Sequence, residues 1–243
     1  MIRRLAVVIV VVLLALVFAQ LMGSYREQQT LHPLAAYYLT HAPVDFGVPN
    51  VVTGILLAWR GLDTLGEVTV LFMVAASVSL LLGAGSAESA GTSGPAAARS
   101  PGEIVQVGAQ ILLPLILTFG AYVIVNGHLS AGGGFQGGAI VASGTMLAML
   151  AQPRATLDID RFGVAESVAG LLYVLAGLCG LVLADGFLDP RFLPRGEFGA
   201  FFSAGAIPLI STLLGLKVGA ELSIVIDRFR LAGNPARQQE SRT

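Results

Sequence analysis

Charged residues are scarce in this sequence. Asp, Glu, Lys and Arg together make up 12% of its 243 residues, about half the share found in soluble domains. The formal net charge is −1, so the chain lacks the dense basic patch that binding to nucleic acid requires. Hydrophobic residues make up 55% of the chain, and its mean hydropathy is +0.78. A soluble fold cannot bury this much apolar surface, so the composition predicts a polytopic membrane protein.

Cysteine and catalytic motifs are also nearly absent. The single cysteine, Cys179, excludes an internal disulfide and any C-x-x-C metal or iron–sulfur site. Its place in an apolar run indicates simple helix packing. The sequence has no nucleophile–base triad, no metal-ligand cluster, no P-loop and no Gly-x-Ser-x-Gly motif. We therefore predict a chain with no catalytic activity, no metal and no cofactor of its own.

Six apolar runs are long enough to cross a membrane. They occupy residues 5–22, 64–82, 104–125, 133–150, 162–183 and 201–226. At about 1.5 Å per residue, each run can cross a hydrocarbon core of about 30 Å, the first only just. The prediction is an all-α, multi-pass protein of the cell membrane, with six transmembrane helices in the lipid bilayer.

The arginines predict the orientation of these spans. With the N-terminus in the cytoplasm, nine arginines lie inside and four lie outside, which fits the positive-inside rule. Both termini are then cytoplasmic. Residues 1–19 also have features of a cleavable secretory signal. The apolar run is slightly long for such a signal, so we favour a retained first span.

A segment of biased composition divides the chain. Residues 83–102 are rich in Gly, Ala, Ser and Pro, a composition typical of a flexible linker. The predicted organisation is therefore a two-span module over residues 1–82, a cytoplasmic linker over 83–102, a four-span domain over 103–230 and a cytoplasmic tail over 231–243.

The third and fourth apolar runs are separated by a glycine-rich string, V-N-G-H-L-S-A-G-G-G-F-Q-G-G-A at residues 125–139. Its glycines are expected to form a structural loop: Gly132, Gly133, Gly134, Gly137 and Gly138. A loop with this much polar backbone is tolerated in a membrane only where it is buried in protein or lines a water-filled cavity. Alternatively, the glycines allow two helices to pack closely through small residues. The string also fits the dinucleotide pattern G-x-G-x-x-G, but no strand precedes it, so no nucleotide is expected.

The same string closely resembles the signature of the B subunit of multisubunit Mrp-type (Mnh) cation/proton antiporters, N-G-H-x-S-x-G-G-G-F-Q-G-G. The resemblance extends over residues 103–230. It implies an integral, non-catalytic subunit that works with the other subunits of the complex, with Na⁺ and H⁺ as the transported ions. Because the glycines and the intramembrane charges need neighbouring protein, we expect the chain to be stable only with its partners.

The first module carries a second resemblance. The sequences N-V-V-T-G-I-L at residues 50–56 and R-G-L-D-T-L-G-E at residues 60–67 resemble the small E subunit of membrane-bound hydrogenases, with Thr53 in place of the usual asparagine. In Mrp antiporters this domain belongs to the large A subunit. Its fusion to a B-like domain implies an alternative function, a membrane-arm subunit of a hydrogenase or sulfur-reducing respiratory complex. A pure scaffold without ion-handling residues is the third interpretation.

Four residues of the second motif fall on one face of a helix: Arg60, Asp63, Thr64 and Glu67. Asp63 and Glu67 lie one turn apart, so they can share a proton or present oxygens to Na⁺. The alternative is an interfacial cap in which Arg60 neutralises Asp63. Glu67 lies deeper and is the stronger candidate, and the resemblance implies that this acidic pair lines an ion path.

Lys217 and Glu221 lie one turn apart in the sixth span. They can form a switch in a proton relay, or a structural pair in which Lys217 extends toward the cytoplasmic face. His128, at the glycine string, is either a proton acceptor at the mouth of a pathway or a residue that fixes the loop by a hydrogen bond. His32 and His41 fall in a polar segment that we interpret as a solvated external loop.

The predicted orientation can be tested with reporter fusions. Fusions within residues 83–101 should report the cytoplasm, and fusions within residues 185–197 should report the outside, because the positive charges distribute in that way. A periplasmic signal from the 83–101 fusions would contradict the topology.

Overall fold

The computed structural model describes residues 2–26, 30–88, 101–152 and 158–232. Within these ranges every regular element is a helix, as predicted. The chain divides into two compact units, Met1–Tyr37 and Tyr38–Thr243. Six helices are long and apolar enough to cross a membrane, which confirms the predicted number of spans.

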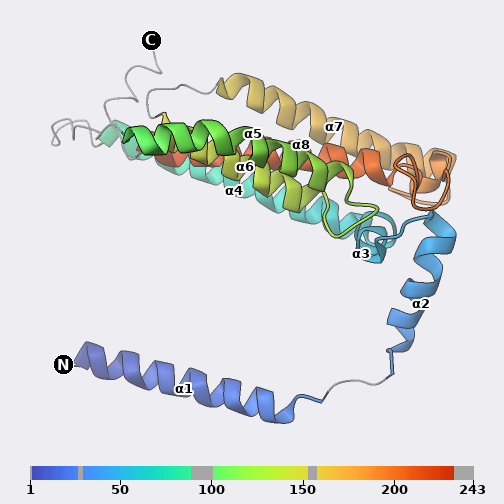
Figure 1. Ribbon diagram of the computed structural model, residues 1–243, viewed down its shortest axis with the longest axis horizontal. Helices are drawn as coiled ribbons and strands as arrows, with labels where there is room; N and C mark the ends of the chain where they lie inside the picture. The colour runs from blue at the N-terminus through green and yellow to red at the C-terminus, as the bar shows by residue number, and fades with distance from the viewer. Residues whose placement is uncertain (1, 27–29, 89–100, 153–157, 233–243) are drawn as a thin grey trace. The chain divides into compact units, whose positions relative to one another are not determined.

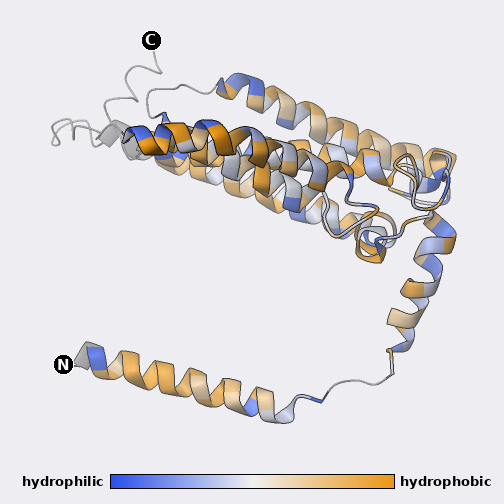
Figure 2. Ribbon diagram, in the orientation of Figure 1, coloured by the Kyte–Doolittle hydropathy of each residue, from blue (hydrophilic) through white to orange (hydrophobic). Residues whose placement is uncertain are grey.

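The first unit contains the helix α1 (Ile2–Ser24) and the beginning of α2 (Pro33–His41). The span Arg4–Ser24 has a mean hydropathy of 3.1, and none of its most apolar stretch is buried inside the chain. Apolar residues cover α1 along nearly its whole length (Figure 2). A helix that is apolar on all sides is suited to direct contact with lipid.

The second unit is a bundle of long helices preceded by a broken helical segment (Figure 1). Its elements are the end of α2, the π-helix η1 (Ala42–Phe46), α3 (Val51–Gly54), the π-helix η2 (Ile55–Trp59), α4 (Gly61–Glu88), α5 (Glu103–Val125), α6 (Gly134–Ala151), α7 (Ile159–Leu183), the short 3₁₀ helix η3 (Pro190–Phe192) and α8 (Ile207–Ala232).

Several predicted boundaries differ from those of the helices, and two of these differences have a local explanation. The sixth span begins at Ile207 and not at residue 201, because several residues before it adopt turns with positive φ, among them Ala204 and Gly205. The helix α4 continues to Glu88, into the segment that its composition assigned to a linker. Alanine in that segment favours a helix, whereas Gly and Ser only weaken one.

The segment that we interpreted as a polar external loop is largely helical. Residues 33–46 and 51–59 form two helical stretches that meet at 81°, and together they are apolar enough to count as a seventh, broken span. Gly47 adopts a positive φ of 68° at the break, and Asn50 caps the stretch that follows by accepting a hydrogen bond from the Thr53 amide. His41 ends α2 and is partly buried, so it lies on a helix and not in the expected loop; His32 precedes the helix and is exposed.

The helix α8 lies at the centre of the bundle, in contact with α4, α5, α6 and α7. In the most apolar stretch of α8, 61% of the residues are buried inside the protein, whereas the corresponding figure for α4 is 11%. This central helix nevertheless carries Lys217, Glu221 and Asp227 as buried residues. Charge is therefore concentrated where the protein is least exposed to its surroundings.

Close packing explains the glycines between α5 and α6. Gly134, Gly137 and Gly138 belong to α6 and not to a loop, which corrects the expected structural loop; Gly132 and Gly133 precede the helix, and Gly133 has a φ of 151°. A Cβ on Gly134 would lie 2.5 Å from the Ser211 carbonyl oxygen of α8. The string thus builds a small-residue helix contact rather than the wall of a wet cavity.

Gly137 provides a test of this contact. A Cβ there would overlap Cγ1 of Ile124 and lie 2.8 Å from the Gly120 carbonyl oxygen, so Gly137→Ala should force α5 and α6 apart and destabilise the protein by about 1–3 kcal/mol. Gly163→Ala is the matched control, because no atom lies within 4 Å of its Cβ position. Thermal unfolding of the complex purified in detergent with its partner subunits should show a lower midpoint for Gly137→Ala only; equal midpoints would contradict the packing argument.

Candidate functional site

The main candidate site is a group of three charged side chains from α7 and α8. Lys217 Nζ donates a hydrogen bond to Glu166 Oε1 at 2.9 Å and lies 3.4 Å from Glu221 Oε2. The Lys217–Glu221 pair was predicted from its spacing, and the structure brings the two side chains together. Glu166 was missed, because it stands alone in an apolar run 51 residues from Lys217. We call these three residues the charge cluster.

Helix packing holds the charge cluster in place. Glu221 is fully buried and Lys217 is 9% exposed. The stem of Lys217 crosses α7 at Gly170, where a Cβ would lie 3.5 Å from Cδ of the lysine, and its ammonium lies 5.4 Å from the centre of the Phe72 ring of α4. The structure thus pairs Lys217 with Glu166 and Glu221 inside the bundle, and its two predicted roles, a relay switch or a structural pair, both remain predictions.

The predicted acidic face of α4 is divided between the surface and the core. Arg60 forms an ion pair with Asp63, and both side chains are exposed on the chain, as is Glu67. Thr64 is buried instead, and its hydroxyl donates to the Leu56 carbonyl at 2.8 Å. Glu67 interacts electrostatically with Tyr173 of α7, whose buried hydroxyl has no hydrogen-bond partner in the described part of the chain.

His128 is fully buried in the turn between α5 and α6. Its Nε2 lies 3.1 Å from the Phe201 carbonyl oxygen, which can only accept, so Nε2 is the donor. Burial lowers the pKa of His128 below its ordinary value, more than the carbonyls of Phe201, Ala200 and Val125 raise it. A neutral imidazole that fixes the turn fits this geometry, and a proton-accepting role remains a prediction.

The two signature motifs bind one another. The side-chain amide of Asn50 donates to the carbonyls of Gly127 at 2.8 Å and Ser130 at 2.7 Å. The hydroxyl of Thr53 donates to the same Gly127 carbonyl at 2.8 Å, and the Asn50 amide N–H donates to the His128 carbonyl at 3.1 Å. We call this contact the motif clamp. Sequence reasoning treated the motifs separately and did not predict it.

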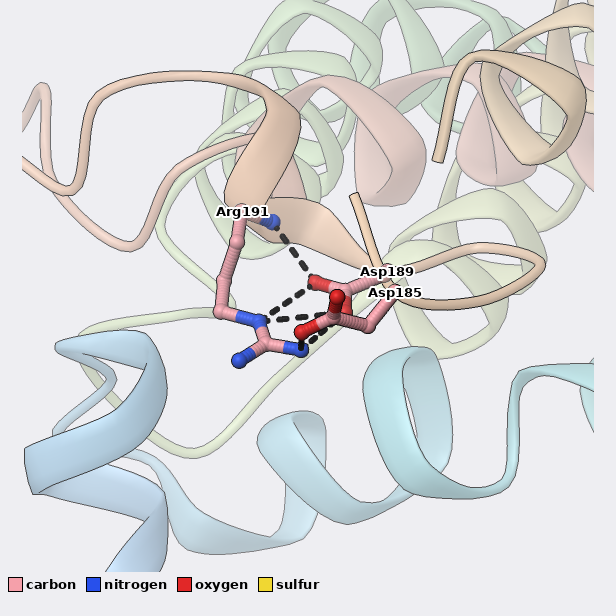
Figure 3. A network of polar contacts seen from close by, with 3 residues as sticks. All are labelled: Asp185, Asp189 and Arg191. Carbon is pink, nitrogen blue, oxygen red and sulfur yellow. Dashed lines mark hydrogen bonds and ion pairs between the residues drawn. The ribbon is translucent and has the colours of Figure 1, made fainter. Parts of the chain in front are cut away.

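A second polar network orders the connection from α7 to α8 (Figure 3). Arg191 binds Asp189 through Nε and Nη2, and Nη2 also donates to Asp185 at 2.8 Å. Burial tends to raise the pKa of Asp189, but its bonds to Arg191 outweigh this effect and lower it. Arg195 then donates to the Val44 carbonyl of η1 at 2.6 Å. These contacts fix the connection that supplies the partner of His128.

Two family models match the chain. A model described as a domain related to the MnhB subunit of Na⁺/H⁺ antiporters matches residues 104–224, and a model of MbhE, the E subunit of MBH, matches residues 2–91. A chain of the membrane-bound sulfane sulfur reductase, an archaeal respiratory membrane complex, shares 34% sequence identity and a TM-score of 0.75, with 94% of this chain and 98% of that chain covered. The chain belongs to the MnhB-related family of membrane subunits. Both resemblances predicted from the motifs are thus confirmed.

Two other proteins match this MnhB-related chain over only part of their own length. A chain of the Mrp complex from Dietzia has 25% identity and a TM-score of 0.74; the match covers 97% of the MnhB-related chain and 26% of the Dietzia chain. The B subunit of the Na⁺/H⁺ antiporter of Bacillus subtilis is 36% identical over 94 residues, which are 37% of the MnhB-related chain and 64% of the Bacillus protein. In the described part of the MnhB-related chain, no three His, Cys, Asp or Glu residues form a group that could hold a metal ion.

The motif clamp gives a direct prediction. Asn50→Ala removes two side-chain hydrogen bonds and a helix cap, and should destabilise the turn by about 1–3 kcal/mol. Hydrogen–deuterium exchange of a peptide covering residues 126–133 should then become faster. The exposed Val52→Ala is the control and should leave the exchange unchanged. Unaltered protection in Asn50→Ala would show that the clamp does not hold the turn.

Proposed function

We propose that this chain is an integral, non-catalytic subunit of a multisubunit monovalent cation (Na⁺)/proton antiporter in the cell membrane. It contributes to assembly and to part of the ion path. The observation that carries the proposal is the charge cluster buried on the central span, because intramembrane charges are expensive and usually serve ion or proton movement. The similarity to the B subunit of the B. subtilis Na⁺/H⁺ antiporter and to the Mrp complex of Dietzia supports the same assignment.

The exposed acidic face of α4 supports a partner protein at this surface. Asp63 and Glu67 lie on a span, yet face away from the interior of the chain. A carboxylate facing lipid costs several kcal/mol or more, so a neighbouring protein or a water-filled path has to cover Glu67. The proposed partners are therefore the other subunits of the complex and the lipid bilayer, with Na⁺ and H⁺ as the ions; no nucleic acid, nucleotide or cofactor is part of the proposal.

A second function is favoured by one observation. The match to the sulfane sulfur reductase complex covers nearly the whole of both chains, whereas the Dietzia match is to part of a longer chain. The alternative is thus a membrane-arm subunit of a respiratory redox complex with the same ion-translocating module. Neighbouring genes for hydrogenase-like subunits, or Na⁺ movement in vesicles that requires a reducible substrate, would favour it; movement driven by a proton gradient alone would favour the antiporter.

Glu67→Gln tests the ion path. The change keeps the shape and the hydrogen-bonding capacity of the side chain but removes its titrating charge, so it should abolish or strongly reduce cation-dependent proton efflux from everted vesicles while the complex still assembles. Glu103→Gln, an exposed glutamate at the start of α5, is the control and should transport normally. Immunoblots of the partner subunits separate lost transport from lost assembly. Normal transport at full assembly would remove Glu67 from the path and favour the scaffold interpretation.

A further inference from the structure

The charges of the charge cluster do not sum to zero when all three groups are ionised. Two carboxylates, Glu166 and Glu221, face one ammonium, that of Lys217. If all three were ionised, one negative charge would remain uncompensated inside the bundle. Such a charge in a medium of low dielectric costs many kcal/mol, so it is normally removed by binding a proton or a cation.

No other charged group close by compensates the excess. Between Ile104 and Ala151 the helices α5 and α6 carry no charged side chain in their described residues, and α4 carries none from Val68 to Leu82. Asp227, further along α8, is in an ion pair with Arg230 at 2.8 Å, so that pair adds no net charge. From Phe162 to Leu183, Glu166 is the only charged residue of α7. Glu67, just before that part of α4, is itself an acid and could not compensate a negative charge.

The two carboxylates differ in their surroundings. Glu166 accepts a hydrogen bond from Lys217 at 2.9 Å, and its side chain is 13% exposed. Glu221 is fully buried, and neither of its oxygens has a hydrogen-bond partner in the described residues. A fully buried carboxylate that has only an ion-pair contact at 3.4 Å and no hydrogen bond is less stable than one that is hydrogen-bonded and partly exposed. The excess charge is therefore neutralised at Glu221.

We propose that Glu221 carries an exchangeable proton, so that the charge cluster consists of a neutral Glu221 beside a Lys217–Glu166 ion pair. Within the proposed function, Glu221 is then a proton-binding station inside this chain. The transport role of the proton rests on the proposed function; its presence at Glu221 does not.

A proton fits this site better than Na⁺. A hard cation needs several oxygen ligands, whereas the only oxygens that the cluster offers come from two carboxylates, one of them already bonded to Lys217. The ammonium also lies 3.4 Å from Glu221 Oε2, where it repels a second cation. A proton needs no further ligand and leaves no additional charge to be solvated.

Infrared spectroscopy of the purified complex, with its partner subunits, tests the proposal directly. Protonated carboxyl groups absorb apart from carboxylates, and their band shifts in D₂O. The wild type should show such a band that is missing from Glu221→Gln, whether the buffer contains Na⁺ or only choline. In Glu166→Gln the band should also be lost, because Glu221 then becomes the ionised partner of Lys217. In the double variant E166Q/K217M the band should return, since Glu221 again has no counter-ion.

Each result decides the question. A band that persists in Glu221→Gln comes from another residue and overturns the proposal. A band seen only without Na⁺ shows that the site binds Na⁺ in place of the proton, which overturns it as well. A band that survives Glu166→Gln contradicts the charge-balance argument. If Glu221→Gln does not assemble, Glu166→Gln and the double variant still give the comparison. Because the spectrum needs no transport, failure of the antiporter function leaves this test intact.

Discussion

The burial of charge on the central helix is the constraint on which the rest of the structure depends. A lysine and two carboxylates can remain inside a membrane bundle only if neighbouring helices exclude lipid and hold them within hydrogen-bonding distance. This requires α8 to contact four other helices, and it requires gaps such as Gly170, where the lysine stem can pass. The surrounding spans act as a shell that makes an otherwise unfavourable arrangement stable.

Small residues provide that shell. Without a hydrophobic driving force between helices in lipid, packing at short distance has to supply much of the association energy. Gly134 and Gly138 bring the backbone of α6 against α8, and Gly137 brings it against α5. The motif that is most conspicuous in the sequence therefore serves first to bring three helices together, and only through this packing does it shape the environment of the charged side chains.

The sequence predicted the long-range architecture well and the local contacts less well. The hydropathy of the sequence predicted six membrane spans, because an apolar helix has to be long enough to cross the bilayer and such runs are visible in the sequence. Spacing within a helix predicted the Lys217–Glu221 pair, because residues four apart are neighbours on one face. Glu166, the Phe72 contact and the motif clamp depend on which helices pack together, and no local pattern encodes that. The helical stretch before Trp59 was missed because its two short pieces, broken at Gly47, are not a continuous apolar run.

The motif clamp has the chemistry of an interface between separate proteins, in which side-chain donors of one element bind the free carbonyls of another. Here both sides lie on one polypeptide, so the contact forms intramolecularly, at an effective concentration that reaches the millimolar range for flexible connections. Its formation does not depend on the abundance of a second chain. The two halves, joined through Asn50 and Gly127, therefore enter any complex in equal number.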